Sequence, residues 1–274
     1  GTGVQTCALP IYMSEKLEKY VYFVGEGKAE GKAKMKQILG GKGANLAEMT
    51  AIGLHVPPGF TISNEACAYY SEHNGAYPNG LREQVLENLA QLEKIMNAKL
   101  GDALNPLLVS VRSGAAQSMP GMMDTVLNLG MSPTAVTGLI EKTNNPRFAW
   151  DSYRRFMQMF GDVVMGVPHH EFEKALQSVK NEKNKELDTQ LDVEDLKEVI
   201  AKYRKVYHRF TKEDFPTDPI DQLFKAIDAV FRSWNNDRAI KYRQMNDIRG
   251  LLGTAVNVQS MVFGNMGDTS GTGV

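Results

Sequence analysis

Apolar and polar residues alternate in four short stretches of the chain, a pattern that predicts β-strands. The stretches are KYVYFV at 19–24, FTI at 60–62, LLVSVR at 107–112 and AVNVQSMVF at 255–263. In the third stretch the alternation places Arg112 at the strand end, on the face opposite Val109 and Val111. Because the fourth run lies close to the last residue of the sequence, we expect it to form half of a hairpin with a partner strand beyond it.

Helical periodicity accounts for most of the remaining chain. Helices are predicted at 44–52, 64–73, 81–100 and 221–234. Gly53 fits the end of the first helix, and Asn64 fits the N-cap of the second. Residues 133–215 show helical and charged stretches without a strand pattern. This order predicts an α+β fold in which a helical segment is inserted, rather than two independent units.

Composition narrows the class of protein. Of the 274 residues, 42% are hydrophobic and 23% are charged, and the net charge is -1. We therefore expect neither a nucleic-acid partner nor a membrane-spanning segment. The two cysteines, Cys7 and Cys67, indicate reduced thiols and predict a cytoplasmic location. Residues 1–12 (GTGVQTCALPIY) differ from the charged chain that begins at Met13, and we expect a non-native or disordered leader there.

The segment LGGKGANLAEM at 39–49 is the first candidate site. Three glycines around Lys42 allow the backbone to come close to an anion, and the amides of the following helix would add donors. Gly43 stands where a P-loop carries Ser or Thr, and Leu46 stands where a Rossmann fingerprint carries its third glycine. The alternative is a flexible turn with a solvated lysine.

Two further segments suit phosphate binding. Arg112, at a strand end, can hold phosphate oxygens in a bidentate fork, although it could equally pair with a carboxylate. Residues 255–263 and the glycine-rich loop that follows could read a purine edge and wrap phosphates, although an ordinary hairpin turn fits the same pattern. The five histidines lack a metal-ligand spacing. Arg147, Arg154 and Arg155 favour surface or inter-helix ion pairs over a second phosphate site.

Six segments, in order along the chain, resemble the nucleotide-binding region of the pyruvate, phosphate dikinase family. They are GGKGANLAEM, LLVSVRSGA, SMPGMMDT, NPRFAWDSYRRF, VFRSWNNDRAI and GTAVNVQSMVFGN. The resemblance runs from about Lys19 to Val274. Related phosphoenolpyruvate synthases share the Lys42 loop but typically carry a second serine and an acidic stretch where this chain has Gly114 and SMPGMMDT. A synthase-like water dikinase and a stand-alone nucleotide-binding module are the alternatives.

The resemblance implies an ATP-grasp-like nucleotide-binding domain with an inserted all-helical subdomain, ending before its second lobe is complete. The implied divisions are a leader at 1–12, a first lobe at 13–131, a helical subdomain at 132–217, a return to the first lobe at 218–262 and the start of a second lobe at 263–274. The whole enzyme would convert ATP, phosphate and pyruvate to AMP, diphosphate and phosphoenolpyruvate. We expect this fragment to be inactive alone.

The family pattern also implies roles for individual residues. Lys42 and Arg112 would contact the ATP phosphates and act in catalysis. The other implied ATP-binding residues are Gly121, Thr125, Gln259, Met261, Val262, Ser270, Gly271 and Thr272. Mg²⁺ would arrive with ATP, with its ligands expected beyond Val274. The implied partners are a phosphohistidine swivel domain and a pyruvate-binding barrel, within a homodimeric full-length enzyme.

Overall fold

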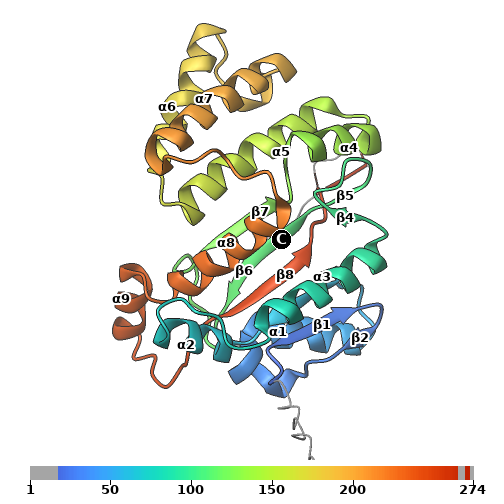
Figure 1. The fold of residues 1–274 in the computed structure, drawn as a ribbon, viewed down its shortest axis with the longest axis vertical. Coiled ribbons are helices and arrows are strands. Elements are labelled where there is room, and N and C mark those ends of the chain that lie inside the picture. The colour runs from blue at the N-terminus through green and yellow to red at the C-terminus, as the bar shows by residue number, and fades with distance from the viewer. Residues whose placement is uncertain (1–17, 265–268, 272–274) are drawn as a thin grey trace, which may run out of the picture.

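An antiparallel sheet organises the chain (Figure 1). Within residues 18–264 and 269–271, which the computed structural model describes, the sheet has six strands in the order β2-β1-β3-β8-β6-β7. They are β1 (Val21–Gly25), β2 (Lys28–Ala29), β3 (Gly59–Ile62), β6 (Val109–Gly114), β7 (Thr125–Leu129) and β8 (Ala255–Ser260). A separate parallel pair joins β4 (Lys99–Leu100) to β5 (Pro106–Leu107). The fold is α+β, as predicted.

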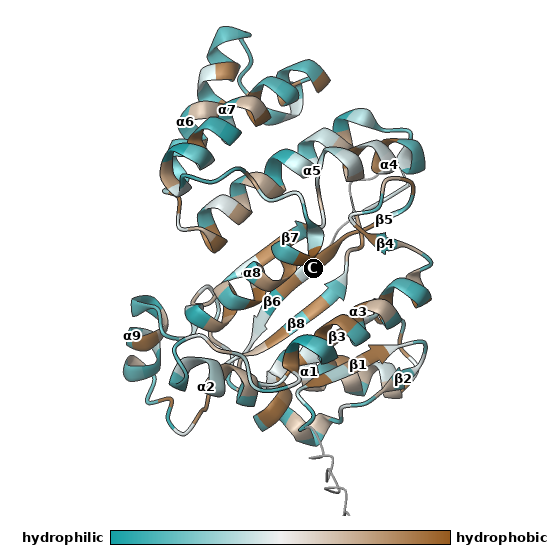
Figure 2. Ribbon diagram, viewed as in Figure 1, coloured by the Kyte–Doolittle hydropathy of each residue, from teal (hydrophilic) through white to brown (hydrophobic). Residues whose placement is uncertain are grey.

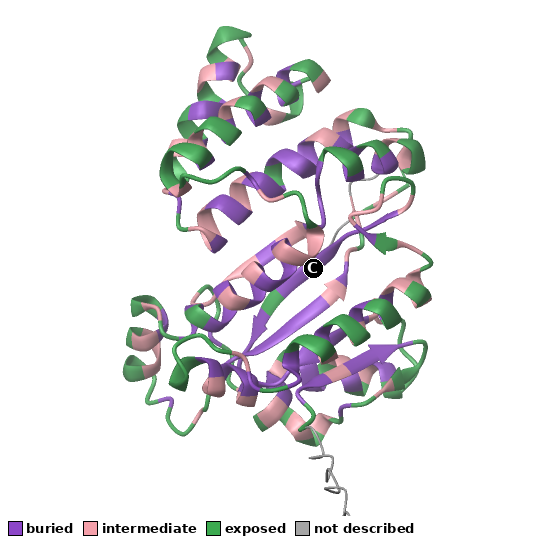
Figure 3. Cartoon of the chain, in the orientation of Figure 1, coloured by how far each residue is buried: buried purple, intermediate pink, exposed green. Residues whose placement is uncertain are grey.

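Helices cover the two faces of the sheet differently. The helices α2 (Asn64–Glu72), α3 (Leu81–Met96) and α8 (Pro219–Ser233) pack on one face, and α1 (Lys36–Ala51) packs on the other. On β3, the side chain of Thr61 faces α1, because a Cβ built on Gly43 would lie 2.7 Å from it. We call this side of the sheet the α1 face. Apolar residues concentrate on the strands (Figure 2), which are largely buried (Figure 3).

β8 lies in the middle of the sheet. It pairs with β3 on one side and with β6 on the other. The expectation of half a hairpin is therefore wrong, although the strand itself is confirmed. The physical reason is burial on both faces: Val256 and Val258 are 0% exposed, and Asn257, which points the other way, is only 3% exposed. A strand covered on both sides suits the centre of a sheet better than an edge.

The predicted helical run after residue 132 is confirmed, and it contains no strand among the described residues. It comprises α4 (Pro133–Thr143), α5 (Pro146–Met159), the π turn η2 (Phe160–Val164), α6 (His169–Glu182), η3 (Asp188–Gln190) and α7 (Val193–Thr211). Ser132 and Asn145 cap α4 and α5, and a proline begins each helix. In Figure 1, α6 and α7 lie beyond α5, at the end of the molecule far from β1.

Phe215 fastens the segment that leads back from α7 to the sheet. Its ring lies edge-on to four aromatic rings, at centroid distances of 5.1 to 6.3 Å. They belong to Tyr153, Phe156, Phe160 and Tyr207. Each such pair contributes about 0.5–1.5 kcal/mol beyond area burial, so the cluster holds α5 and α7 together before the chain enters α8.

The glycine-rich segment before the predicted 44–52 helix is helical rather than a loop. α1 begins at Lys36 and passes through this segment with one break, at Gly40 (φ 68, ψ 176). A Cβ on Gly40 would lie 1.5 Å from the carbonyl oxygen of Gly114. The helix therefore begins earlier than the predicted residue 44, because the single residue Gly40 makes the turn and a new helical turn starts directly after it.

Three further differences are smaller. β7 was not predicted, because a register shift opposite Val109–Val111 and the left-handed Asn128 (φ 57) disrupt its alternation. The predicted 81–100 helix ends at Met96. Ser63 is the N-cap of α2, and the Asn64 side chain instead donates to the carbonyl of Gln37. The end of α1 is as predicted, with Gly53 at φ 86.

The Gly40 contact yields a stability prediction. Gly40→Ala would place a methyl group against a backbone oxygen in a conformation open mainly to glycine, so we expect the free energy of unfolding to fall by about 3 kcal/mol or more. Gly53→Ala is the matched control, because Gly53 has a positive φ but open space around its Cβ, and it should lose only about 1 kcal/mol. Urea unfolding measures both, and equal losses would contradict the close approach.

Candidate functional site

The break at Gly40 makes Gly41, Lys42 and Gly43 the first turn of a new helical segment. The Gly41 amide donates to the carbonyl of Ala115 at 2.9 Å, which ties this turn to the end of β6. The following amides are unpaired within the helix by geometry and carry the positive end of its dipole. The helical turn that starts at Gly41 therefore lies next to the end of β6, which carries Arg112 and Ser113.

Lys42 reaches across to β6. Its Nζ donates to the carbonyl oxygen of Ser113 at 3.0 Å. Desolvation of the amine, and secondarily the positive charge of Arg112, lower the Lys42 pKa below its usual value. The two cations thus repel one another, and no carboxylate in the described part of the chain offsets this effect on the Lys42 pKa.

Arg112 is positioned by its strand. It lies opposite Asn257 of β8 and Thr125 of β7, so these side chains share one face of the sheet. The pair with Asn257, which in turn lies opposite Thr61, places Arg112 on the α1 face. The guanidinium is exposed and forms no hydrogen bond or ion pair with any residue in 18–264 or 269–271. The carboxylate pairing considered from the sequence is absent from this part of the chain.

A cavity of about 560 Å³ opens beside Lys42, and we call it the Lys42 cavity. It is lined by Lys36, Gly41, Lys42, Asn45, Thr125 and residues from 113 to 123 that include Gly121. No Asp or Glu is among its described lining residues. The neighbouring Asp124 is paired with Arg238 at 2.5 Å. Lys42, Gly121 and Thr125 therefore line the same cavity, in which lysine is the only charged residue type among the described lining residues.

A second cavity of about 530 Å³, the Met261 cavity, lies where β8 ends. Met261 and Val262 line it together with Leu127 of β7 and residues of α5, η2 and α6. Gln259 lines neither cavity: its Nε2 donates to the carbonyl of Pro57 at 2.9 Å. The predicted residues that line a cavity thus fall in two different cavities. Both cavities are lined by β7, the first by Thr125 and the second by Leu127.

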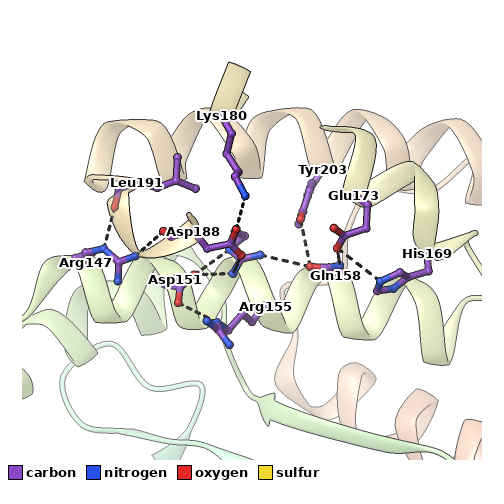
Figure 4. Close-up of polar contacts among 11 residues, drawn as sticks. Arg147, Asp151, Arg155, Gln158, His169, Glu173, Lys180, Asp188, Leu191 and Tyr203 are labelled. Carbon is purple, nitrogen blue, oxygen red and sulfur yellow. Dashed lines mark hydrogen bonds and ion pairs between the residues drawn. The ribbon is translucent and has the colours of Figure 1, made fainter. Parts of the chain in front are cut away.

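The helical wall of the Met261 cavity is built on a buried arginine, Arg154, and Figure 4 shows the polar contacts of the nearby Arg147, Asp151 and Arg155. Arg154 is 3% exposed and pairs with Asp151 at 2.8 Å and with Asp188 at 3.5 Å. Arg155 pairs with the other oxygen of Asp151 at 2.9 Å. Arg147 donates to the carbonyls of Asp188 and Leu191. Arg147 and Arg154 therefore join α5 to the η3 region, whereas the exposed Arg155 pairs within α5. These contacts are the surface and inter-helix pairs that the sequence favoured.

Two of the predicted residues add little to this geometry. Ser270 and Gly271 lie in the described stretch 269–271, which lines neither cavity, and Thr272 lies outside the described residues. The described residues contain no group of three His, Cys, Asp or Glu side chains arranged to hold a metal ion. Mg²⁺ prefers carboxylate oxygens, and the described lining of the Lys42 cavity offers none, so these described residues do not form a Mg²⁺ site.

Comparison with known proteins agrees with this geometry. A family model described as "Pyruvate phosphate dikinase, AMP/ATP-binding domain" matches residues 36–94 and 77–274. The chain belongs to the pyruvate phosphate dikinase family. A pyruvate, phosphate dikinase of Mesembryanthemum crystallinum is 59% identical over 93% of this chain, and one of Oryza sativa subsp. japonica is 58% identical over 94%. The chain spans 27% of the length of each of these dikinases.

The comparison corrects the predicted cytoplasmic location. The Mesembryanthemum and Oryza dikinases are both named as chloroplastic. The prediction was wrong because it rested on cysteine usage, which reports a reducing environment rather than a particular compartment. No helix among the described residues is long and apolar enough to cross a membrane.

Sequence reasoning missed two features of the site. Lys36 lines the Lys42 cavity, and Asn257 lies beside Arg112 in the sheet. Asn257 is visible in the sequence as a polar residue between Val256 and Val258, but its neighbours come from strands far away in sequence. The pairing of β8 with β6 had to be known before it could be placed.

The proximity of the two cations can be tested by titration. Because Arg112 lowers the Lys42 pKa, Arg112→Leu should raise it, whereas Arg249→Leu, at an exposed arginine paired with Asp247, should leave it unchanged. The measurement is the pH dependence of the Lys42 Cε resonance in ¹³C NMR. An unchanged Lys42 titration in Arg112→Leu would show that the two side chains do not interact.

Proposed function

We propose that this chain binds ATP, with the phosphates in the Lys42 cavity and the adenosine toward the Met261 cavity. The observation that carries the proposal is the pair of cations, Lys42 and Arg112, beside a cavity whose described lining has no carboxylate. Lys42 lines the cavity and Arg112 lies beside it, and neither forms an ion pair with a described carboxylate. Binding of a polyanion would relieve the repulsion between the two cations, which favours its binding. The helical turn after Gly40 adds backbone amides to the same site.

The spacing of the cavities supports this orientation. From Asn257, which lies opposite Arg112, to Met261 is four residues along β8, or about 13 Å at ~3.3 Å per residue. Asn257 and Met261 point to the same face because side chains alternate along an extended chain. A nucleoside triphosphate laid along this face would pass Gln259, the residue expected beside adenine. Ser270, Gly271 and Thr272 would then cover the phosphates.

We further propose an ATP-grasp-like architecture for this α+β fold. Residues 13–131 and 218–262 would form the first lobe, 132–217 the helical subdomain, and 263–274 the start of a second lobe. Support comes from the chain order of the elements, since α4–α7 fall between β7 and α8, and from α8 and β8 returning to the same sheet. Residues 1–12, the proposed leader, lie outside the described residues.

The related dikinases are much longer than this chain, so we also propose, rather than conclude, that this chain takes part in their complete reaction. Dikinases by name act on pyruvate and phosphate. In phosphoryl transfer the protein mainly positions the nucleotide and neutralises charge, and Lys42 and Arg112 are suited to both tasks. Mg²⁺ would enter with ATP. A phosphohistidine swivel domain, a pyruvate-binding barrel and a second subunit are the proposed partners.

Calorimetry with a non-hydrolysable ATP analogue tests the site. Hydrogen bonds to charged groups contribute about 1.5–3 kcal/mol, so Lys42→Ala and Arg112→Ala should each weaken binding about 10- to 100-fold. Binding by the unaltered chain should be weak, since the chain spans only 27% of the length of the dikinases that it resembles. Lys142→Ala, on α4 and bonded to Asn105, serves as control and should bind like the unaltered chain. Equal affinity in all four proteins would refute the proposed site.

A separate experiment tests whether the chain binds the nucleotide without carrying out the complete reaction. The chain incubated with ATP, phosphate and pyruvate should form no phosphoenolpyruvate, because we assign to it nucleotide binding and no group that accepts a phosphoryl. Coupled detection of phosphoenolpyruvate makes the measurement. Sustained turnover by the purified chain would contradict this assignment.

A further inference from the structure

A row of polar side chains crosses the sheet at the level of Arg112. Thr61 of β3 lies opposite Asn257 of β8, Asn257 lies opposite Arg112 of β6, and Arg112 lies opposite Thr125 of β7. Residues directly opposite one another in antiparallel strands point to the same face. All four side chains therefore lie on the α1 face. Two of them, Arg112 and Thr125, are already part of the proposed phosphate site, whereas Thr61 and Asn257 have no assigned role.

Asn257 is the unusual member of this row. It is 3% exposed, and its Oδ1 accepts a hydrogen bond from the Thr61 hydroxyl at 2.9 Å. Its Nδ2 has no hydrogen-bond partner among the described residues. Buried amide groups are normally paired, because burial without a partner opposes folding.

The unpaired amide lies at the base of Lys42. A Cβ built on Gly114 would lie 2.5 Å from Asn257 Nδ2 and 3.5 Å from the Lys42 Cβ. The Asn257 amide and the Lys42 side chain are therefore separated here by a space that a side chain at position 114 would fill. Gly114 also lines the Lys42 cavity. The amide thus lies next to Gly114, a residue that lines the cavity, and close to the stem of Lys42.

The chemistry of an amide at this position differs from that of the alternatives. An aspartate of the same shape would place a negative charge beside Lys42 and Arg112 and would neutralise them. A leucine would fill the space but could not accept the Thr61 hydroxyl. An asparagine keeps the hydrogen bond and a fixed position while it adds no charge.

We propose that Asn257, held by Thr61, is a positioning residue for the phosphate-binding cations. It fixes Lys42 beside Arg112 and leaves the two cations without a countercharge until an anion enters. This inference rests on the proposed ATP site, because it concerns the same cations. It is nevertheless separable from that site, because it also predicts how Lys42 titrates when no nucleotide is present.

The decisive variant is Asn257→Asp. An opposite charge within about 4–6 Å raises a lysine pKa by roughly 1–3 units, so the Lys42 titration in ¹³C NMR should move up by about one unit or more. Affinity for the ATP analogue should fall at least about tenfold while the melting temperature is kept or raised, since the new charge is paired. If Asn257 had only a structural role, Asn257→Asp would change the melting temperature and leave the Lys42 pKa unchanged.

Two milder variants and a control complete the experiment. Thr61→Val and Asn257→Leu remove the hydrogen bond without adding charge, and each should shift the Lys42 Cε resonance and weaken analogue binding about threefold or more. Ser260→Ala is the matched control: Ser260 is also buried and unpartnered on β8, but it points to the opposite face. Its Lys42 titration and analogue binding should equal those of the unaltered chain.

The outcomes are separable. An unaltered chain that does not bind the analogue contradicts the proposed function, whereas the Lys42 titrations still decide the role of Asn257. Asn257 has no positioning role if folded Asn257→Asp titrates at Lys42 like the unaltered chain. If Asn257→Asp does not fold, an unchanged Lys42 resonance in both Thr61→Val and Asn257→Leu overturns the proposal, and a shift in both supports it.

Discussion

The close approach of α1 to the end of β6 is the constraint on which the site depends. The backbone of Gly40 passes so near the carbonyl of Gly114 that no side chain fits between them, and Gly41 donates a hydrogen bond to Ala115. This contact starts a fresh helical turn above the strand end and brings Lys42 across to Ser113. Without it, Lys42 would be an ordinary surface lysine and Arg112 an ordinary strand-end arginine.

Held together in this way, the two cations oppose the folding of the ligand-free chain. Burial already disfavours the charged form of Lys42, and Arg112 disfavours it further. Folded proteins tolerate such unfavourable arrangements where they serve function. The polar row beneath the cations, and the absence of carboxylates from the described lining of the cavity, both preserve their charge for an incoming anion. This arrangement supports the proposal that the site binds phosphates, since an anion would supply the missing countercharge.

Local sequence patterns predicted the elements better than their arrangement. The strands at β1, β3, β6 and β8 and the helical run from α4 to α7 follow from periodicity, which depends on near neighbours. The central place of β8 could not be predicted in this way, because its partners β3 and β6 are distant in sequence. The same limit explains the site: Lys42 and Arg112 were identified individually, whereas their repulsion and the role of Asn257 depend on pairings across the sheet. The helical turns on both sides of Gly40 were not predicted, because glycines are unfavourable in helices and the three glycines at 40–43 suggested an irregular segment.

In the proposed complex a nucleotide lies along the α1 face, with its phosphates at Lys42 and its adenosine at Met261. Backbone NMR of the isotopically labelled chain, titrated in parallel with inorganic triphosphate and with an ATP analogue, tests this placement most directly. Triphosphate should shift the amide signals of Gly41 to Gly43 and of residues 113–125 alone. The ATP analogue should shift these signals and, in addition, those of Leu127 and Met261 to Phe263. Identical shifts with both ligands, or adenosine-dependent shifts confined to other parts of the chain, would contradict the account.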